Sequence, residues 1–353
     1  MINIGQKQLR TIDGLVRTGC CESMEQFVEV AIRNQIVYEA QAAETGSAPS
    51  QSEYSQGIQK KQSSLDVIRA TSKRRDAVKL DTRPIWRHIE IPITPLPDVK
   101  PATRPLWGQF YRFLPLKLVA RLLAQAQSKQ PIQMKVFCHE VVAEAMNLAD
   151  QLRLVNATET GIPFATGFPN NKHDARKSAD RFVSQYVGRV RSDGRLDGFL
   201  SALGFASLKQ VNKDRYIGLT AAGTKFASLP NTVLDDGVVP PLLSDQEVSF
   251  LIRYIAQQMP GERDQLQEII KLISEDTNTP RQLDSTLGNF YKIRYSDGEW
   301  TDAKVSVTHA GAMSRLAEMQ LIRLTRDGRR VTYGLQDVKQ ENLLLLHDEE
   351  GAT

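Results

Sequence analysis

The chain has 353 residues, of which 41% are hydrophobic and 24% charged, so its composition is globular and its length allows two or three domains. Its 45 Lys and Arg against 41 Asp and Glu leave a net charge of +4, which permits a nucleic-acid partner without requiring one. Three cysteines, Cys20, Cys21 and Cys138, do not make a disulfide framework, and no apolar run approaches the roughly 18 residues of a membrane span. We therefore expect a soluble, cytoplasmic protein that lies on the nucleoid.

The N-terminal segment, residues 1–40, predicts a short strand followed by two helices. Ile2 and Ile4 face one side of the strand, because strand side chains alternate. Ser23 followed by Gln26 has the form of a capping box and begins the second helix. A segment of this length is too short to bury a stable core alone, so it needs the rest of the chain or a second copy of itself.

Residues 2–36, with INI, QLRTIDGLVRTG and SMEQFVEVAIRNQI, resemble the ribbon-helix-helix family of DNA-binding repressors. The resemblance implies a homodimer whose two strands pair into a ribbon that enters the major groove of double-stranded DNA. It implies dimer contacts at Ile2, Ile4, Leu9, Ile12, Phe27 and Ile36, and DNA contacts at Asn3, Lys7 and Ser23. The strand offers few outward polar residues, so dimerisation without base reading is the alternative.

Residues 41–82 predict a flexible linker, because the stretch is rich in Ser, Gln and Gly and poor in apolar bulk. Between residues 69 and 121 the chain has 12 Lys and Arg against 4 Asp and Glu, so basic charge is concentrated there. Arg74 and Arg75 within this stretch are candidates for DNA contact.

Residues 83–115 predict an extended arm, because prolines 84, 92, 95, 97, 101 and 105 rule out a long helix. The arm mixes Arg and Lys with Trp86, Trp107 and Tyr111, a combination that suits a phosphate backbone. The alternative is an arm whose aromatic and aliphatic side chains pack on the next domain while its charges stay solvated.

Residues 116–232 predict a first domain with helices at 116–127, 134–155 and about 172–190. The passage RLDGFLSALGFASLKQVNKDRYIGLT then predicts a short helix, a strand, a charged turn and a returning strand. This order resembles the winged helix-turn-helix fold of multiple-antibiotic-resistance-type transcription regulators. The resemblance implies DNA contact near the helix start, at Arg189, Arg191 and Arg195, and on the wing, at Lys213 and Arg215.

Residues 244–338 predict a second domain of the same kind. LSALGFASLKQVNKDRYIGLT at 200–220 aligns without gaps with LAEMQLIRLTRDGRRVTYGLQ at 316–336, which indicates one supersecondary unit used twice. Its candidate DNA contacts lie on the wing and on the preceding helix: Arg326, Arg329 and Arg330, and Lys304, Ser306, Thr308 and Arg315. An acidic tail, 339–353, follows.

Motifs of catalysis are missing from the sequence: there is no phosphate-binding G-x-x-x-x-G-K-[ST] loop, no H-E-x-x-H, no G-x-S-x-G and no Cys/His cluster. We expect the five histidines to be surface or hydrogen-bonded helical residues, and we expect no cofactor and no metal.

The sequence as a whole predicts a mainly α-helical chain with small β-hairpins (α+β), in which a ribbon-helix-helix module precedes tandem winged-helix domains. Its predicted function is a non-enzymatic, dimeric DNA-binding protein, in the simplest case a transcriptional regulator. The alternatives are a plasmid-type replication initiator or partition protein, and a non-catalytic scaffold subunit that binds an enzyme of a DNA-processing or phage-defence complex.

Overall fold

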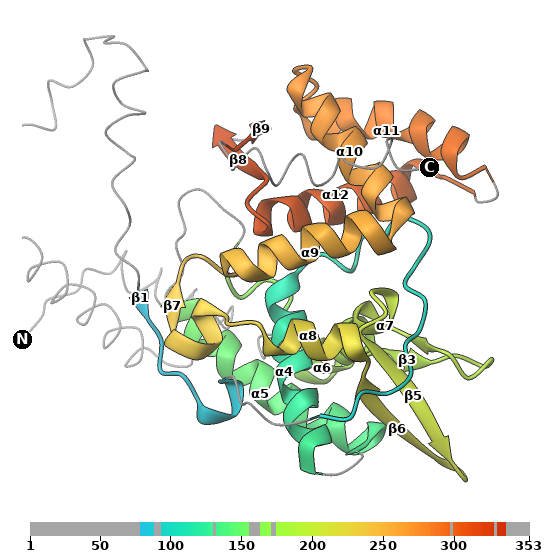
Figure 1. Cartoon of the computed structure of the whole chain (residues 1–353). Helices are drawn as coiled ribbons and strands as arrows, with labels where there is room; N and C mark the ends of the chain where they lie inside the picture. The colour runs from blue at the N-terminus through green and yellow to red at the C-terminus, as the bar shows by residue number, and fades with distance from the viewer. Residues whose placement is uncertain are drawn as a thin grey trace, which may run out of the picture. The chain divides into compact units, whose positions relative to one another are not determined.

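A computed structural model places the described residues in one unit, residues 77–353 (Figure 1). It describes residues 78–87, 93–129, 132–154, 163–170, 174–296, 299–327 and 330–336. This part is mainly helical with small antiparallel sheets, which confirms the predicted α+β class. The predictions for the N-terminal module at 1–40, most of the linker, Arg74, Arg75, Arg329 and the acidic tail lie outside the described residues.

The first part of the unit follows the order helix, strand, helix, helix, hairpin, and we call residues 113–219 the first copy. Its elements are α4 (Phe113–Lys129), β2 (Ile132–Gln133), α5 (Met134–Leu154), α6 (Ala175–Phe182) with its π-helical extension η3 (Val183–Val187), α7 (Phe199–Ala202), β5 (Ala206–Val211) and β6 (Asp214–Leu219). Strand β6 lies between β5 and β2, and all neighbouring strands are antiparallel. Helix α8 (Ala221–Ser228) follows the hairpin.

Residues 260–335 repeat this order in a shorter form, and we call them the second copy. Its elements are α10 (Pro260–Ser274), α11 (Pro280–Arg294), α12 (Asp302–Glu318), β8 (Ile322–Asp327) and β9 (Arg330–Leu335). Helix α9 (Asp245–Gln258) lies between the two copies (Figure 1). The hairpin predicted within 244–338 and the helix before it are present as β8–β9 and α12.

The two hairpins match position by position at an offset of 116 residues. Ala206 pairs with Leu219 in the first hairpin, and Ile322 pairs with Leu335 in the second. The third strand of the first sheet, in which Ile132 pairs with Ile217, has no counterpart strand among the described residues of the second copy; there the backbone N–H of Tyr333, 116 positions after Ile217, donates to the carbonyl of Asn278 at 2.9 Å. The internal repeat predicted from the sequence is therefore present in the hairpins of both copies.

The copies differ just before the hairpin, where the first copy contains an extra hairpin of β3 (Arg189–Val190) and β4 (Leu196–Asp197). The second copy has the continuous helix α12 at the corresponding positions. Gly188 and Gly194 take positive φ values of 118° and 83°, which side-chain-bearing residues rarely adopt, so the helix cannot continue there. The predicted helix at 172–190 is thus wrong at its C-terminal end, which lies at Val187.

Helix α9 and helix α11 of the second copy begin at strong capping signals. Ser244 and Glu247 form a capping box at α9, and Thr279 with Gln282 forms another at α11, where Pro280 occupies the first helical position. These residues satisfy backbone N–H groups that have no partner within the helix.

Short elements tie the start of the described chain to the first copy. Strand β1 (Val78–Lys79) pairs with β7 (Val238–Val239), which follows the π-helical turn η4 (Thr232–Asp236). The 3-10 turn η2 (Pro84–Trp86) buries the Trp86 ring, and its indole N–H donates to Glu144 at 2.8 Å. The Arg121 guanidinium holds the same region with two bonds to Asp235, at 2.8 and 3.0 Å.

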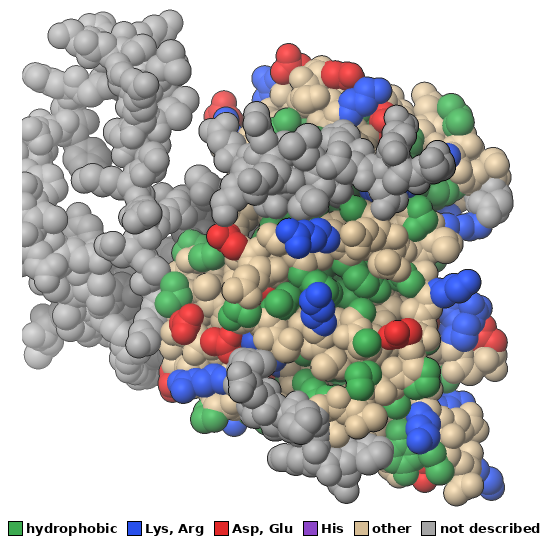
Figure 2. Space-filling model, viewed as in Figure 1, with side chains coloured by type: hydrophobic (Ala, Val, Ile, Leu, Met, Phe, Trp, Pro, Cys, Tyr) green, Lys and Arg blue, Asp and Glu red, His purple; other side chains and the backbone are tan. Residues whose placement is uncertain are grey.

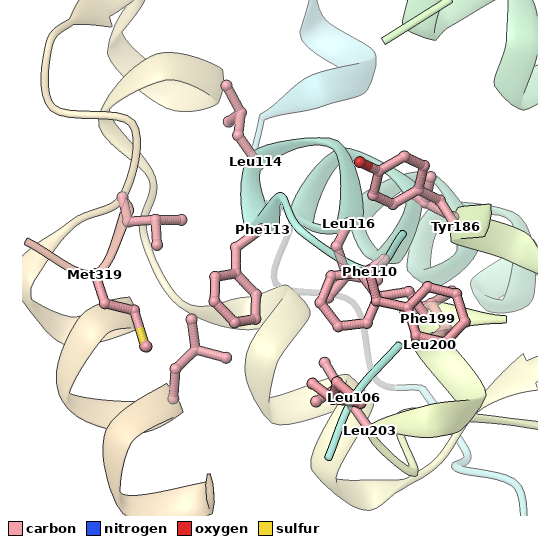
Figure 3. Close-up of a cluster of buried hydrophobic side chains, with 14 of the residues drawn as sticks. Leu106, Phe110, Phe113, Leu114, Leu116, Tyr186, Phe199, Leu200, Leu203 and Met319 are labelled. Atoms are coloured by element: carbon pink, nitrogen blue, oxygen red, sulfur yellow. The ribbon is translucent and has the colours of Figure 1, made fainter. Parts of the chain in front are cut away.

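An aromatic core joins the arm to both copies. Figure 3 shows Phe113 at the start of α4 between Met319 at the end of α12 and the pair Phe110 and Phe199. The rings of Phe110 and Phe199 stack with centroids 5.2 Å apart, and Tyr186 extends the cluster. Since each of these side chains is at most 2% exposed, this part of the arm packs on the domain, as the second of the two sequence interpretations predicts, whereas Trp107 of the arm is exposed and its Arg112 is buried.

Buried carboxylates from the second half of the unit hold the first half. Glu318 of α12 accepts the backbone N–H groups of Phe113 at 2.6 Å and Leu114 at 3.0 Å, and so caps α4 from a distant part of the chain. Burial raises the pKa of the Glu318 carboxyl. Glu247 of α9 lies 2.9 Å from the Lys117 ammonium of α4. The segments predicted as two separate domains are therefore joined through their cores.

Candidate nucleic-acid interface

The first hairpin, β5–β6, carries an exposed group of cations at its outer end. Its side chains are buried near α7 and become exposed toward the turn, where Asn212 takes a positive φ of 56°. Lys209, Lys213 and Arg215 are exposed on this outer part. Among the described residues no ion pair involves Lys213 or Arg215, so both charges are available to an anionic partner.

The small hairpin β3–β4 adds further cations beside the first hairpin. Arg189 is exposed, Arg191 pairs with Asp197 at 2.8 Å, and Arg195 pairs with Asp193 at 2.7 Å. The hydrogen bond from Arg195 holds the pKa of Asp193 below its usual value. Exposed ion pairs of this kind are weak, so a phosphate could displace either carboxylate.

Helix α6 presents cations that the sequence analysis did not single out. Arg176, Lys177 and Arg181 are exposed, and Lys177 and Arg181 share a helix face because they are four positions apart. The stretch ARKSADRF, with three cations in a short polar helix separated from the hairpin β3–β4 by η3, is the signal that would have identified them.

The cations of the first copy gather on one edge of the unit. In Figure 1 the hairpins β3–β4 and β5–β6 project from the right-hand side, and Figure 2 shows Lys and Arg side chains there with a few Asp and Glu. The second hairpin lies on the opposite side, at the upper left. The two predicted wings therefore do not form one continuous surface.

The second hairpin carries Arg326 and Arg330 in exposed positions near its turn. Asp327 is the partner of Arg330 in the strand register, so one carboxylate accompanies the two cations. Arg323 is exposed on the same strand. The first hairpin has the same balance of described charges, because Asp214 accompanies Lys209, Lys213 and Arg215 there.

Two residues predicted to contact DNA from α12 are buried, and their prediction is wrong. Arg315 is 0% exposed; its Nε donates to Glu262 at 2.8 Å, and another guanidinium nitrogen donates to the carbonyl of Phe110. Thr308 is only 6% exposed. The C-terminal half of α12 is covered by the arm, where Gly311 approaches Gly108 so closely that a Cβ would lie 2.5 Å from the Gly108 carbonyl oxygen.

The exposed N-terminal half of α12 has little positive charge. Lys304 is half-buried, because its ammonium donates to the carbonyl of Glu299 at 2.9 Å and lies 4.3 Å from the centre of the Trp300 ring. Ser306 is exposed as predicted, and it is accompanied by Val307, which is 58% exposed. The face resembles an apolar contact surface more than one built for phosphates.

No group of three or more His, Cys, Asp or Glu side chains in the described part of the chain could hold a metal ion. His309 is buried with its Nδ1 2.7 Å from Asp284, which confirms a hydrogen-bonded helical histidine, and burial lowers its pKa. Burial raises the pKa of the Cys138 thiol to about 11, so it remains protonated at neutral pH.

Comparison of the chain with protein-family models, curated proteins and solved structures gives no match. Within the described ranges, no helix is both long and apolar enough to cross a membrane.

Proposed function

We propose that this chain is a non-enzymatic DNA-binding protein built around two winged-helix units. The observation that carries the proposal is the order helix, strand, helix, helix, hairpin, in which the middle strand pairs with the second strand of the hairpin. That order is the one by which winged helices place a helix and a hairpin against a duplex. The repetition of the hairpin at an offset of 116 residues, in the same register, supports one origin for both units.

In this proposal the first copy makes the main DNA contact. The hairpin tip with Lys213 and Arg215 would follow the phosphates of one groove, while Arg191 and Arg195 on β3–β4 occupy the place where a recognition helix ordinarily begins. A set of several phosphate contacts gives binding that weakens steeply as salt rises. The simplest biological role for such a protein is transcriptional regulation, and replication initiation is the alternative.

The N-terminal module completes the proposal as a source of dimerisation. Two chains joined through residues 1–40 would present two first copies to one DNA molecule, which raises affinity through effective concentration. A nearly symmetric or repeated DNA site is the expected target.

A second candidate function, the scaffold subunit, is favoured by α12. Its exposed face offers Val307 with Ala303 and Ala310 and lacks free basic side chains among the described residues. A winged helix with such a face is suited to binding a protein.

Duplex binding measured at several salt concentrations tests the proposal. Lys213→Ala/Arg215→Ala should weaken binding, and should reduce the slope of log K against log salt by about 2, because each phosphate contact contributes about 0.9. Lys271→Ala/Lys292→Ala removes the same charge from exposed positions of α10 and α11 and is the matched control. Equal effects of the two pairs would refute a contact at the first hairpin.

Selection from random duplexes separates the candidate roles. Enrichment of a defined motif that persists at high salt supports a regulator or an initiator. Binding without a motif, lost at high salt, supports the scaffold.

A further inference from the structure

We propose that a cleft beside the first hairpin binds unpaired nucleotides of single-stranded DNA, with a base stacked on Trp107. The inference rests on the proposed function and deepens it, because it assigns a second form of DNA to a particular place on the first copy.

The cleft has a volume of about 650 Å³ and lies between the arm, the hairpin β3–β4, α7 and the start of β5. Trp107 and Phe110 of the arm line one wall, and Ala206, Ser207 and Leu208 of β5 line another. This volume is within the range of sites that hold small organic ligands, and it accommodates one or two nucleotides.

Trp107 is the feature that points to a ligand. It is 60% exposed, whereas the other two tryptophans have partners: Trp86 is fully buried, and Trp300 stacks on Tyr291 with centroids 4.3 Å apart. No aromatic ring stacks on Trp107 within the described ranges. A rigid, exposed indole is a stacking platform for any base, since every base has a π-face.

The cations around the cleft suit the phosphates of the same strand. Lys100, Arg191 and Arg195 line the cleft, against one carboxylate, that of Asp197. The Arg195 side chain is 77% exposed and that of Arg191 is 51% exposed, so both can turn from their carboxylate partners toward a phosphate. Aromatic stacking combined with a cationic rim is the arrangement by which proteins hold single strands without sequence preference.

The cleft is continuous with the proposed duplex contact. Strand β5 begins in the cleft at Ala206 and continues into the exposed end of the hairpin, so Leu208 and the turn at Asn212 are about 13 Å apart along the strand. A duplex on the hairpin could therefore pass one unpaired strand into the cleft. An acidic peptide would use the cations but would have no need of the exposed indole.

The test uses the full chain and a fluorescein-labelled (dT)12 oligonucleotide, followed by anisotropy and by quenching of tryptophan emission. We expect Trp107→Ala to weaken (dT)12 binding about 5- to 140-fold, the loss that one stacked base represents, and Trp107→Phe to retain most of it. Leu154→Ala is the control, because it truncates an 88% exposed side chain on α5 that does not line the cleft. The quenching should disappear with Trp107.

The outcomes separate this inference from the proposed function. If the protein binds duplex through Lys213 and Arg215 but does not bind (dT)12, single-strand binding in the cleft is refuted and the proposed function stands. Failure to bind either form of DNA would overturn both. Base stacking would also be refuted if the wild type and Trp107→Ala bind (dT)12 with equal affinity. The same holds if a poly-glutamate peptide of the same length fully displaces (dT)12 with no change in quenching.

Discussion

Because the Lys117 ammonium is buried, we expect the free energy of unfolding to increase as the pH rises above neutrality. Lys117 is 0% exposed, lies 2.9 Å from Glu247, and donates to the carbonyls of Phe226 and Leu229, at 2.5 and 2.7 Å. Burial outweighs these favourable contacts and lowers its pKa from 10.5 to about 8. The charge is therefore less favourable in the folded state than in the unfolded one.

The direction of this pH dependence follows from the number of protons that the folded and unfolded states bind. Between about pH 8 and 10.5 the unfolded chain holds the Lys117 proton and the folded chain has lost it, so raising the pH favours the folded state. Over pH 7.5 to 9.5 the change amounts to about 2 kcal/mol. Tyrosines act in the opposite direction at higher pH, because burial raises the pKa of Tyr254 and Tyr295 to about 12, so the window ends near pH 9.5.

Urea unfolding followed by circular dichroism at pH 7.5, 8.5 and 9.5 measures the effect. The double variant Lys117→Met/Glu247→Gln removes both charges and keeps a side-chain oxygen for the N–H groups of Asn231 and Ser244, so it should fold and lose the pH dependence. A wild type whose free energy of unfolding stays flat or falls over this range would refute the reasoning. A double variant whose free energy of unfolding still rises with pH as steeply as that of the wild type would also refute it.

Three further predictions concern packing, buried charge and assembly. Gly311→Ala should lower the free energy of unfolding by about 1–3 kcal/mol, because its Cβ would overlap the arm. Gly288→Ala should raise the free energy of unfolding slightly, because a Cβ at this position of α11 meets no close neighbour. Thermal melts compare the two variants. Arg315→Met should cost about 3–5 kcal/mol in urea unfolding, because Glu262 keeps an unpaired buried charge. Deleting residues 1–40 should convert a dimer to a monomer in light scattering, and a dimer that survives would refute the predicted dimerisation module.

The hairpins were predictable because their signal is local. Alternating apolar residues, a charged turn and a repeated pattern predict strands 206–211 and 214–219 and their counterparts without knowledge of tertiary contacts. The starts of α9 and α11 have an equally local signal, since the capping residues Ser244 and Thr279 act on neighbouring residues alone.

Burial of charged residues was not predictable in this way. Arg315 occupies a helix position that looks like a DNA contact, and only the structure brings Glu262, 53 positions earlier, to it. Glu318 likewise reads as an ordinary helix-end carboxylate, although it caps a helix 205 positions before it. Pairings over such distances leave no local pattern in a single sequence, so these side chains were assigned to the surface or passed over.

The two copies differ in structure at the positions of α12. In the first copy, Gly188 and Gly194 accompany a cationic hairpin at the positions that correspond to the first part of α12, and no buried carboxylate among the described residues requires that hairpin to stay packed. In the second copy the corresponding helix is continuous, and its inner half binds the arm and α4 through Arg315 and Glu318. A helix committed to those buried bonds cannot also lie with its full length in a groove of DNA. The second copy therefore holds the arm in place, and in the function that we propose the first copy, with the adjoining cleft at Trp107, makes the contact with nucleic acid.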